Sequence, residues 1–303
     1  MMMKTEAIDG LTLDQFQCNK PLKEICTFGI GGPALYFKEI RTIEEIQQAI
    51  VICNGKNIPY MILGKGSNCL FDDRGYQGAV LCNKIDFLKT PSAGVFHVGA
   101  GYSFSLLGAQ TARQNWSGLE FASGIPASVG GAVYMNAGAN GAETCEHLLS
   151  VDYVTDEGRL VTFQKSDLRF GYRHSPFQSM RGAIVGATFA LSPCTSARAK
   201  QLDIITYRKK TQPYGEKSAG CVFRNPPVGH AGALIDQAGL KGTGVGGAKV
   251  SELHANFIVN TTGATCQEVL ELIEAVRKKV RETSGIELES EVKIIKWSLD
   301  EPV

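Results

Sequence analysis

The fold is decided by residues 119–141, which read LEFASGIPASVGGAVYMNAGANG. The window from Phe121 to Ala142 carries no charge and has the length of a membrane-spanning helix. Its composition excludes that structure, because glycine, proline and asparagine recur and long branched side chains are sparse. Glycine lets backbone approach a ligand and supplies the positive φ that points successive N–H groups at one place. The stretch predicts a pyrophosphate site; the alternative is a tightly packed glycine-rich core turn.

Length and charge set the class of protein. The 303 residues suggest two or three domains, and contents of 44% hydrophobic and 20% charged residues are typical of a soluble globular protein. With 31 basic against 30 acidic residues, nothing indicates a nucleic-acid or membrane partner. The run Arg208-Lys209-Lys210 is interpreted as a solvated helix face.

Cysteine usage indicates the compartment. The 9 cysteines are odd in number and form no C-x-x-C pair, which argues against a disulfide framework and against structural zinc, and for a reducing environment. No metal site is expected. The opening Met-Met-Met-Lys-Thr-Glu has no apolar segment, so no signal peptide is expected. We expect a cytoplasmic protein.

A second glycine-rich loop follows a regular pattern of elements. Thr42 and Glu45 form a capping box that opens a helix, and residues 60–63 form a buried strand. The strand leads directly into Gly64-Lys65-Gly66-Ser67-Asn68. Strand, helix, strand and glycine-rich loop outline a phosphate-binding arrangement, although a short G-x-G alone is weak evidence.

Further elements are expected downstream. Residues 150–154 and 159–163 predict a β-hairpin, and residues 197–210 a helix. Residues 242–247 contain a literal G-x-G-x-x-G, but a helical segment precedes it and a strand follows, so no dinucleotide-binding unit is predicted. Thr265 and Glu268 cap a last helix that ends at Gly285, and residues 293–297 form a strand.

The glycine-rich stretches resemble one enzyme family. Residues 124–139 (GIPASVGGAVYMNAGA) and 64–68 (GKGSN) are similar to the flavin-binding segments of the UDP-N-acetylenolpyruvoylglucosamine reductases. The resemblance implies an α+β protein: an FAD-binding fold of the vanillyl-alcohol-oxidase/PCMH type in two subdomains (1–90 and 91–195), then a C-terminal α+β substrate domain (196–303). It implies FAD contacts at Gly64, Lys65, Gly66, Ser67, Asn68, Ser123, Gly124, Ile125, Pro126, Ser128, Gly130, Gly131, Asn136, Gly138 and Val185.

Three further motifs resemble the catalytic side of that family. They are residues 170–175 (FGYRHS), 218–226 (SAGCVFRNP) and 288–292 (LESEV), and they imply catalytic roles for Arg173, Cys221 and Glu291. The position of Cys221 is usually serine. The strand at 183–187 follows Arg173 closely, so there is no room between them for the insertion that covers the substrate in the first subclass of the family. In this respect the chain resembles the second subclass, which lacks that insertion. The resemblance also implies substrate contacts at Tyr172, Lys209, Asn225, Lys241, His254 and Asn256.

The implied activity is NADPH-dependent reduction, through FAD, of UDP-N-acetylglucosamine enolpyruvate to UDP-N-acetylmuramate. This step supplies peptidoglycan precursors for cell-wall biogenesis, cell shape and cell division, and we expect a monomer. Arg173 and a protonated Glu291 would stabilise charge on the enolpyruvyl carboxylate, and Glu291 needs a raised pKa that burial could supply. A free thiol has a pKa of about 8.5, so Cys221 could donate a proton at neutral pH.

Alternatives remain at this stage. Cys221 could be a small buried hydrophobe, the commonest state of free cysteine. The chain could be an FAD-dependent oxidase of the same superfamily that uses oxygen instead of NADPH. It could also be a non-catalytic flavin- or nucleotide-binding protein that lost its acid when serine became cysteine.

Overall fold

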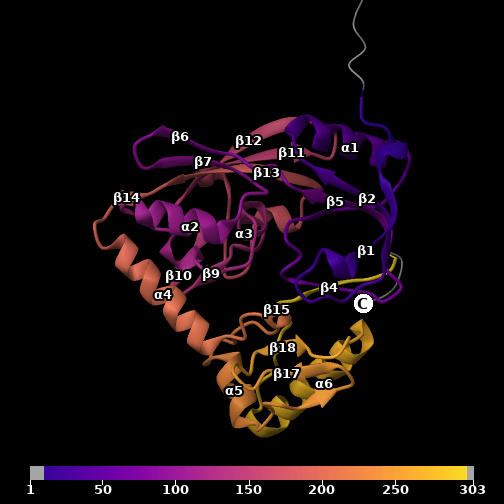
Figure 1. Cartoon of the computed structure of the whole chain (residues 1–303), viewed down its shortest axis with the longest axis vertical. Helices are drawn as coiled ribbons and strands as arrows, with labels where there is room; N and C mark the ends of the chain where they lie inside the picture. The colour runs from indigo at the N-terminus through magenta and orange to yellow at the C-terminus, as the bar shows by residue number, and fades with distance from the viewer. Residues whose placement is uncertain (1–9, 299–303) are drawn as a thin grey trace, which may run out of the picture.

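The computed structural model describes residues 10–298. The opening methionine-rich segment, where the sequence shows no signal peptide, lies outside the described residues. Within the described part, no helix combines the length and the apolar character needed to cross a membrane. The chain forms an upper body of two sheets and a lower body with a third sheet, joined along one side by a long helix (Figure 1).

The first sheet has the strand order β1-β2-β5-β3 and mixes directions. Its first pair is antiparallel, whereas β2, β5 and β3 run parallel. The elements are β1 (Gln17–Pro21), β2 (Pro33–Ile40), α1 (Ile43–Gly55), β3 (Tyr60–Leu63) and β5 (Tyr76–Asn83). The predicted capping box is confirmed, since the Thr42 side chain accepts from the Glu45 N–H. Apolar clusters cover both faces of this sheet, which explains its near-continuous apolar strands.

The second sheet is antiparallel with the order β12-β11-β13-β7-β6. Its elements are β6 (Leu88–Ser92), β7 (Val95–Gly99), β11 (Leu148–Thr155), β12 (Leu160–Gln164) and β13 (Gly182–Ala190). The predicted hairpin is confirmed as β11 and β12. Helices α2 (Phe104–Arg113) and α3 (Val129–Met135) share its core. Ala183 and Val185 of β13 pack instead into the core around α1, which joins the two sheets.

Two short ladders connect loops of the upper body. β9 (Gly138–Ala139) pairs with β10 (Ala142–Glu143), and β8 (Trp116–Ser117) pairs with β14 (Ser192–Pro193). After β14, α4 (Ala197–Thr211) crosses from the upper to the lower body (Figure 1).

The third sheet has the order β15-β18-β17-β16 and is antiparallel. Its elements are β15 (Lys217–Cys221), α5 (Ala231–Gln237), β16 (Gly244–Val245), β17 (Ala248–Val250), β18 (Phe257–Asn260) and α6 (Cys266–Ser284). The G-x-G-x-x-G run leads into the β16–β17 hairpin and not into a helix, so the exclusion of a dinucleotide unit is confirmed. The capping box of Thr265 and Glu268 and the left-handed Gly285 at the end of α6 are confirmed as well.

The end of the chain returns to the upper body. β19 (Lys293–Ile295) pairs in parallel with β4 (Cys69–Phe71), near which the described chain ends in Figure 1. Next to β4, the Asp73 carboxylate accepts the N–H groups of Cys266 and Gln267 and so caps the N-terminus of α6. The lower body is thus fixed to the upper one at β4 as well as through α4.

Candidate active site

A cavity of about 820 Å³ lies where the three sheets meet. Its wall includes the loop after β3, much of the glycine-rich stretch 124–139, the start of β13, the end of α4 and the end of β15. The two glycine-rich segments that the sequence predicts to bind the cofactor, 64–68 and 124–139, therefore line the same cavity. Arg173, Cys221 and Glu291 line it too.

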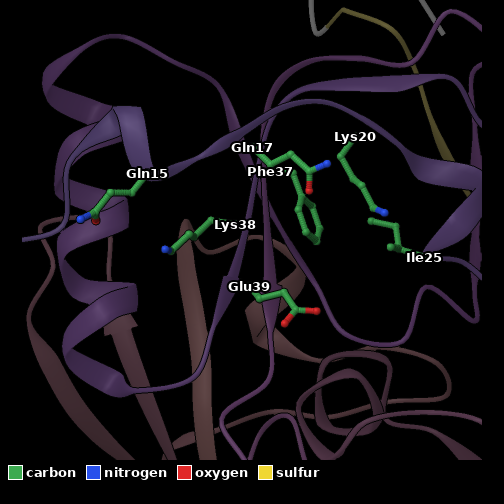
Figure 2. Close-up of a pocket in the computed structure, with 7 residues that line it drawn as sticks. All are labelled: Gln15, Gln17, Lys20, Ile25, Phe37, Lys38 and Glu39. Carbon is green, nitrogen blue, oxygen red and sulfur yellow. The ribbon is translucent and has the colours of Figure 1, made fainter.

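A hollow of about 320 Å³ elsewhere has a different character. It lies over β1 and β2 and is lined by Gln15, Gln17, Lys20, Ile25, Phe37, Lys38 and Glu39 (Figure 2). None of the predicted site residues borders it. The large cavity is therefore the candidate site.

The two glycine-rich loops are packed against each other. Ser128 precedes α3 and its hydroxyl accepts from the Gly131 N–H. A Cβ on Gly64 would lie 2.3 Å from that hydroxyl, so a larger residue at Gly64 would separate the loops. Gly66 has φ +60° and lies against the backbone of Cys26, which disfavours any side chain there. These glycines allow two backbone segments to form one side of the cavity.

The first loop offers unused donors. Within residues 10–298, the backbone N–H groups of Lys65, Gly66, Ser67 and Asn68 donate to no protein acceptor. Successive free N–H groups in a loop form a concave anion site of the kind that binds pyrophosphate. The Lys65 ammonium donates to the Ser103 hydroxyl at 2.9 Å, and burial, followed by the nearby Lys84, lowers its pKa.

The cavity also contains a polar group without a partner. Tyr153 lines it and is almost fully buried, and its hydroxyl has no hydrogen-bond partner among the described residues. Its ring is held by Phe177, stacked at 5.4 Å, and by Phe163. A buried hydroxyl without a partner costs about 1–3 kcal/mol. A long cavity with free N–H groups at one loop and an unpaired hydroxyl on its wall fits the dinucleotide FAD.

The catalytic end is built on a tight turn. The backbones of Gly171 and His174 exchange hydrogen bonds of 3.1 and 3.0 Å, and Arg173 between them has φ 54°. This left-handed conformation is uncommon for arginine and persists where its surroundings hold it. The Arg173 guanidinium donates to Glu291 Oε1 at 2.7 Å and to the Gly138 carbonyl at 3.0 Å. Both ends of the residue are therefore fixed.

Glu291 is held by the returning chain. Its N–H donates to the Val222 carbonyl at 2.7 Å, and its carbonyl accepts from the Asn68 side chain at 3.2 Å. Glu287 and Glu289 are exposed, whereas the Glu291 side chain is only 14% exposed. Burial raises the pKa of Glu291, and the opposing effect of Arg173 is smaller. The raised pKa that its proposed role requires is therefore present.

The surroundings of Cys221 favour the protonated form of its thiol. Its side chain lines the cavity and is partly buried. Burial and then the Glu291 carboxylate raise its pKa to about 12, against the opposing effects of Arg173 and Arg208. The thiol is thus a weaker acid than a free cysteine, and it keeps the proton that a donor needs.

The predicted cofactor residues divide into two groups. Those lining the cavity are Gly64, Lys65, Gly66, Ser67, Asn68, Gly124, Ile125, Pro126, Ser128, Gly130, Gly131 and Gly138. Ser123, Asn136 and Val185 do not line it. Asn136 is fully buried and joins Glu143, Gly171 and Cys145 by hydrogen bonds, so it supports the loops. Val185 packs in the core around α1, and the Ser123 hydroxyl is buried without a partner among the described residues.

None of the predicted substrate residues lines the wall of the cavity. The Tyr172 ring packs on Arg173, and its hydroxyl accepts the Asn225 N–H. Lys241 forms an exposed ion pair with Asp236. His254 stacks edge-on against Phe257, and burial, then Lys241 and Arg208, lowers its pKa.

Asn256 and Lys209 lie in surroundings that differ from those expected of substrate contacts. Asn256 is buried and binds both the N–H and the carbonyl of Phe223. Lys209 is exposed on α4, and its neighbour Arg208 enters the cavity instead. The interpretation of residues 208–210 as a solvated face is wrong for Arg208, which is 9% exposed. Its spacing from the buried Ala197 and Gln201 follows the helical period and could have identified it.

The fold and the cavity define the class of protein. Residues 34–164 match a family described as an FAD binding domain. This match agrees with the free N–H groups of the loop at residues 65–68 and with the α+β architecture. Arg173, Cys221 and Glu291 line the same cavity as that loop. The chain is an FAD-dependent oxidoreductase.

The particular family follows from the remaining comparisons. Residues 212–295 match the C-terminal domain of UDP-N-acetylenolpyruvoylglucosamine reductase. A protein of that name from Protochlamydia amoebophila is 61% identical over 95% of this chain and 96% of its own length, and one from Chlamydia felis is 49% identical over 92% and 94%. The crystal structure of the reductase (MurB) from Thermus caldophilus has a TM-score of 0.79 at 36% identity, covering 93% of this chain and 99% of the other. The chain belongs to the UDP-N-acetylenolpyruvoylglucosamine reductase family.

Proposed function

We propose that the chain reduces UDP-N-acetylglucosamine enolpyruvate to UDP-N-acetylmuramate with electrons from NADPH, as a step of peptidoglycan precursor synthesis for cell-wall biogenesis, cell shape and cell division. One observation supports it above others. Arg173, Cys221 and Glu291 come from distant parts of the chain and line the same cavity as the FAD-binding loops. The names of the relatives and the family of the C-terminal part agree with this substrate.

The residues that would hold FAD are those of the cavity wall. The free N–H groups of residues 65–68 would bind the pyrophosphate, and the Tyr153 hydroxyl would gain a hydrogen bond. Bound FAD supplies a hydride, received from NADPH, to C3 of the enolpyruvyl group. We assign the FAD-binding subdomains to 1–90 and 91–195 and the substrate part to 196–303.

The side chains act on the carboxylate and on C2. As the new C–H bond forms at C3, the C2=C3 electron pair moves toward C2 and the adjacent carboxylate. Arg173 stabilises this charge, and protonated Glu291 donates a hydrogen bond to it. The Cys221 S–H bond then breaks and its proton goes to C2, which leaves a thiolate beside Arg173 and Arg208 until solvent returns the proton.

The residues around the cavity complete the proposal. Tyr172, Asn225, Lys241, His254 and Asn256 would shape the space for the substrate, and the short segment from Arg173 to β13 is consistent with the second subclass. We propose a monomer in the cytoplasm, where a reducing environment would keep the Cys221 thiol free.

The test uses the purified protein. We expect a flavin spectrum and NADPH oxidation that depends on the enolpyruvyl ether, with one NADPH consumed per product. Rapid NADPH oxidation with oxygen uptake and no need for the ether would show an oxidase. Bound flavin without turnover of either kind would show a binding protein.

A further inference from the structure

Helix α4 brings one cation to the cavity. Ala197, Gln201 and Arg208 are its buried side chains, while Lys209 and Lys210 face solvent. Arg208 lines the same cavity as Cys221 and lies close enough to influence the Cys221 thiol and the His254 imidazole. A guanidinium is thus held within the site by a helix that belongs to neither glycine-rich loop.

The charge of Arg208 has no acidic counter-ion among the described residues. Its Nε donates to the Tyr214 hydroxyl at 3.2 Å, and no acidic side chain of residues 10–298 forms an ion pair with it. The carboxylate nearest the reaction centre, Glu291, is already engaged by Arg173. Burying a charge without a partner is unfavourable, so buried cations in proteins are paired or bind an anion. The two terminal nitrogens of Arg208 are therefore available to an anionic ligand.

A hydrogen-bond chain fixes this guanidinium relative to the flavin-binding loop. The Tyr214 hydroxyl donates to the Gly124 carbonyl at 2.8 Å, and the Gly124 N–H donates to the Ser105 hydroxyl at 2.7 Å. A Cβ on Gly124 would lie 2.2 Å from the Tyr214 hydroxyl, so the contact requires glycine. Arg208, Tyr214 and Gly124 connect α4 directly to the glycine-rich stretch.

We propose that Arg208 binds a phosphate of a diphosphate ligand in the cavity, and that Tyr214 is a positioning residue that holds its guanidinium against the Gly124 loop. The planar guanidinium group of arginine suits phosphate oxygens. Nη1 and Nη2 of Arg208 remain for such a ligand, because only Nε donates to Tyr214. The FAD pyrophosphate is assigned above to the N–H groups of residues 65–68, so the candidate ligands of Arg208 are the diphosphates of the UDP-sugar and of NADPH. The proposal rests on the proposed function for these two ligands.

The experiment titrates the FAD-loaded protein with uridine diphosphate and, separately, with NADP⁺, following the flavin absorbance. The variants are Arg208→Met, Arg208→Lys and Tyr214→Phe, with Lys210→Met on the same helix as the matched control. Charge-assisted hydrogen bonds lead us to expect a Kd raised about 10- to 100-fold by Arg208→Met and less by Arg208→Lys for one of the ligands. Tyr214→Phe should raise the Kd for the same ligand severalfold, less than Arg208→Met does, because the guanidinium keeps its charge and loses only its anchor.

Each half-reaction identifies the source of the diphosphate. A weakened uridine diphosphate complex with normal flavin reduction by NADPH assigns Arg208 to the UDP-sugar, and the reverse assigns it to NADPH. If Arg208→Met weakens uridine diphosphate binding and also slows flavin reduction by NADPH while FAD stays bound, Arg208 belongs to a site that the two ligands occupy in turn. Unchanged Kd values for both in Arg208→Met and Arg208→Lys would overturn the proposal, as would loss of FAD from both variants.

These titrations stand apart from the proposed function. If the parent protein failed to reduce the enolpyruvyl ether, the proposed function would fail, but the effect of Arg208 on the two Kd values would still be measured.

Discussion

The Arg173 guanidinium and the Glu291 carboxylate lie 2.7 Å apart, although 118 residues separate them in the chain. Their side chains are 18% and 14% exposed, so the pair is largely desolvated. Arg173 comes from the upper body and Glu291 from the segment that leads into β19. Closing the last strand onto β4 therefore assembles the candidate catalytic pair, and the fold couples the end of the chain to the chemistry.

We predict that Arg173→Lys separates the two half-reactions. Lysine keeps the charge but cannot bind Glu291 and the Gly138 carbonyl at once, as Arg173 does. Losing one well-placed donor to a developing anion slows the chemical step about 10²–10³-fold. Stopped-flow absorbance should show flavin reduction by NADPH at nearly the rate of the parent. Reoxidation of the flavin by the enolpyruvyl ether should be slower by the factor of about 10²–10³ given above.

Arg169→Lys is the control for that variant, because Arg169 is exposed in the same segment. If Arg173→Lys lost FAD or slowed both half-reactions equally, its role would be to hold the Gly138 turn and not to act on the substrate.

Features encoded within a few residues could be predicted from the sequence. The capping boxes at Thr42 and Thr265 join groups three positions apart, and Gly285 ends its helix through its own backbone freedom. The pairing of β19 with β4 has no such signal, because a parallel ladder between residues 69–71 and 293–295 depends on the whole intervening fold. The sequence predicts a strand at residues 293–297 without indicating its partner, and the structure shows that it pairs with β4.

The candidate site follows the same division. The glycine-rich loops were identifiable because ligand-binding backbone needs a special composition, and both line the cavity. Arg208 was misjudged, since a run of three cations resembles a solvated surface unless the helical period is followed along α4. Asn136 was expected at the cofactor, but its amide groups are used by Glu143, Gly171 and Cys145, partners that only the tertiary structure brings near.

The thiol of Cys221 gives a second prediction. Cys221→Ala removes the proposed proton donor, so NADPH should still reduce the flavin while transfer to the enolpyruvyl ether stalls. Positioned proton transfer contributes about 10²–10⁴-fold, which sets the expected loss in the second half-reaction. Cys221→Ser should keep activity to within severalfold, because a hydroxyl occupies the same place. Full turnover by Cys221→Ala at the parent rate would return Cys221 to the role of a small buried side chain.

Tyr153→Phe should weaken FAD binding without harming the fold. The hydroxyl is buried and unpaired among the described residues, so its removal should leave the apoprotein as stable as the parent or slightly more stable. If FAD supplies the missing partner, the lost hydrogen bond of about 0.5–1.5 kcal/mol raises the Kd about 2- to 10-fold. Quenching of FAD fluorescence measures it, with Tyr207→Phe, on an exposed residue, as the control. An unchanged Kd would place the hydroxyl away from FAD.

The pH dependence of stability tests the state of Glu291. An unfolded glutamate has a pKa of about 4.3, and burial raises the value in the folded protein. Below the unfolded pKa the carboxyl is neutral in both states, so its stabilising contribution is fully present there. As the pH rises through the folded pKa, the folded protein holds the proton that the unfolded chain has already lost, and the free energy of unfolding falls.

Glu291→Gln cannot titrate, so it isolates this effect from the other carboxylates. The stability of the parent minus that of Glu291→Gln should decrease as the pH rises above the unfolded pKa of about 4.3, measured by urea unfolding at each pH. Glu289→Gln, on an exposed neighbour, corrects for general charge effects. A difference that increases with pH would mean that the attraction to Arg173 exceeds the effect of burial and holds Glu291 ionised. Glu291 would then serve as a partner that orients Arg173, and the hydrogen bond to the enolpyruvyl carboxylate would have to come from another donor.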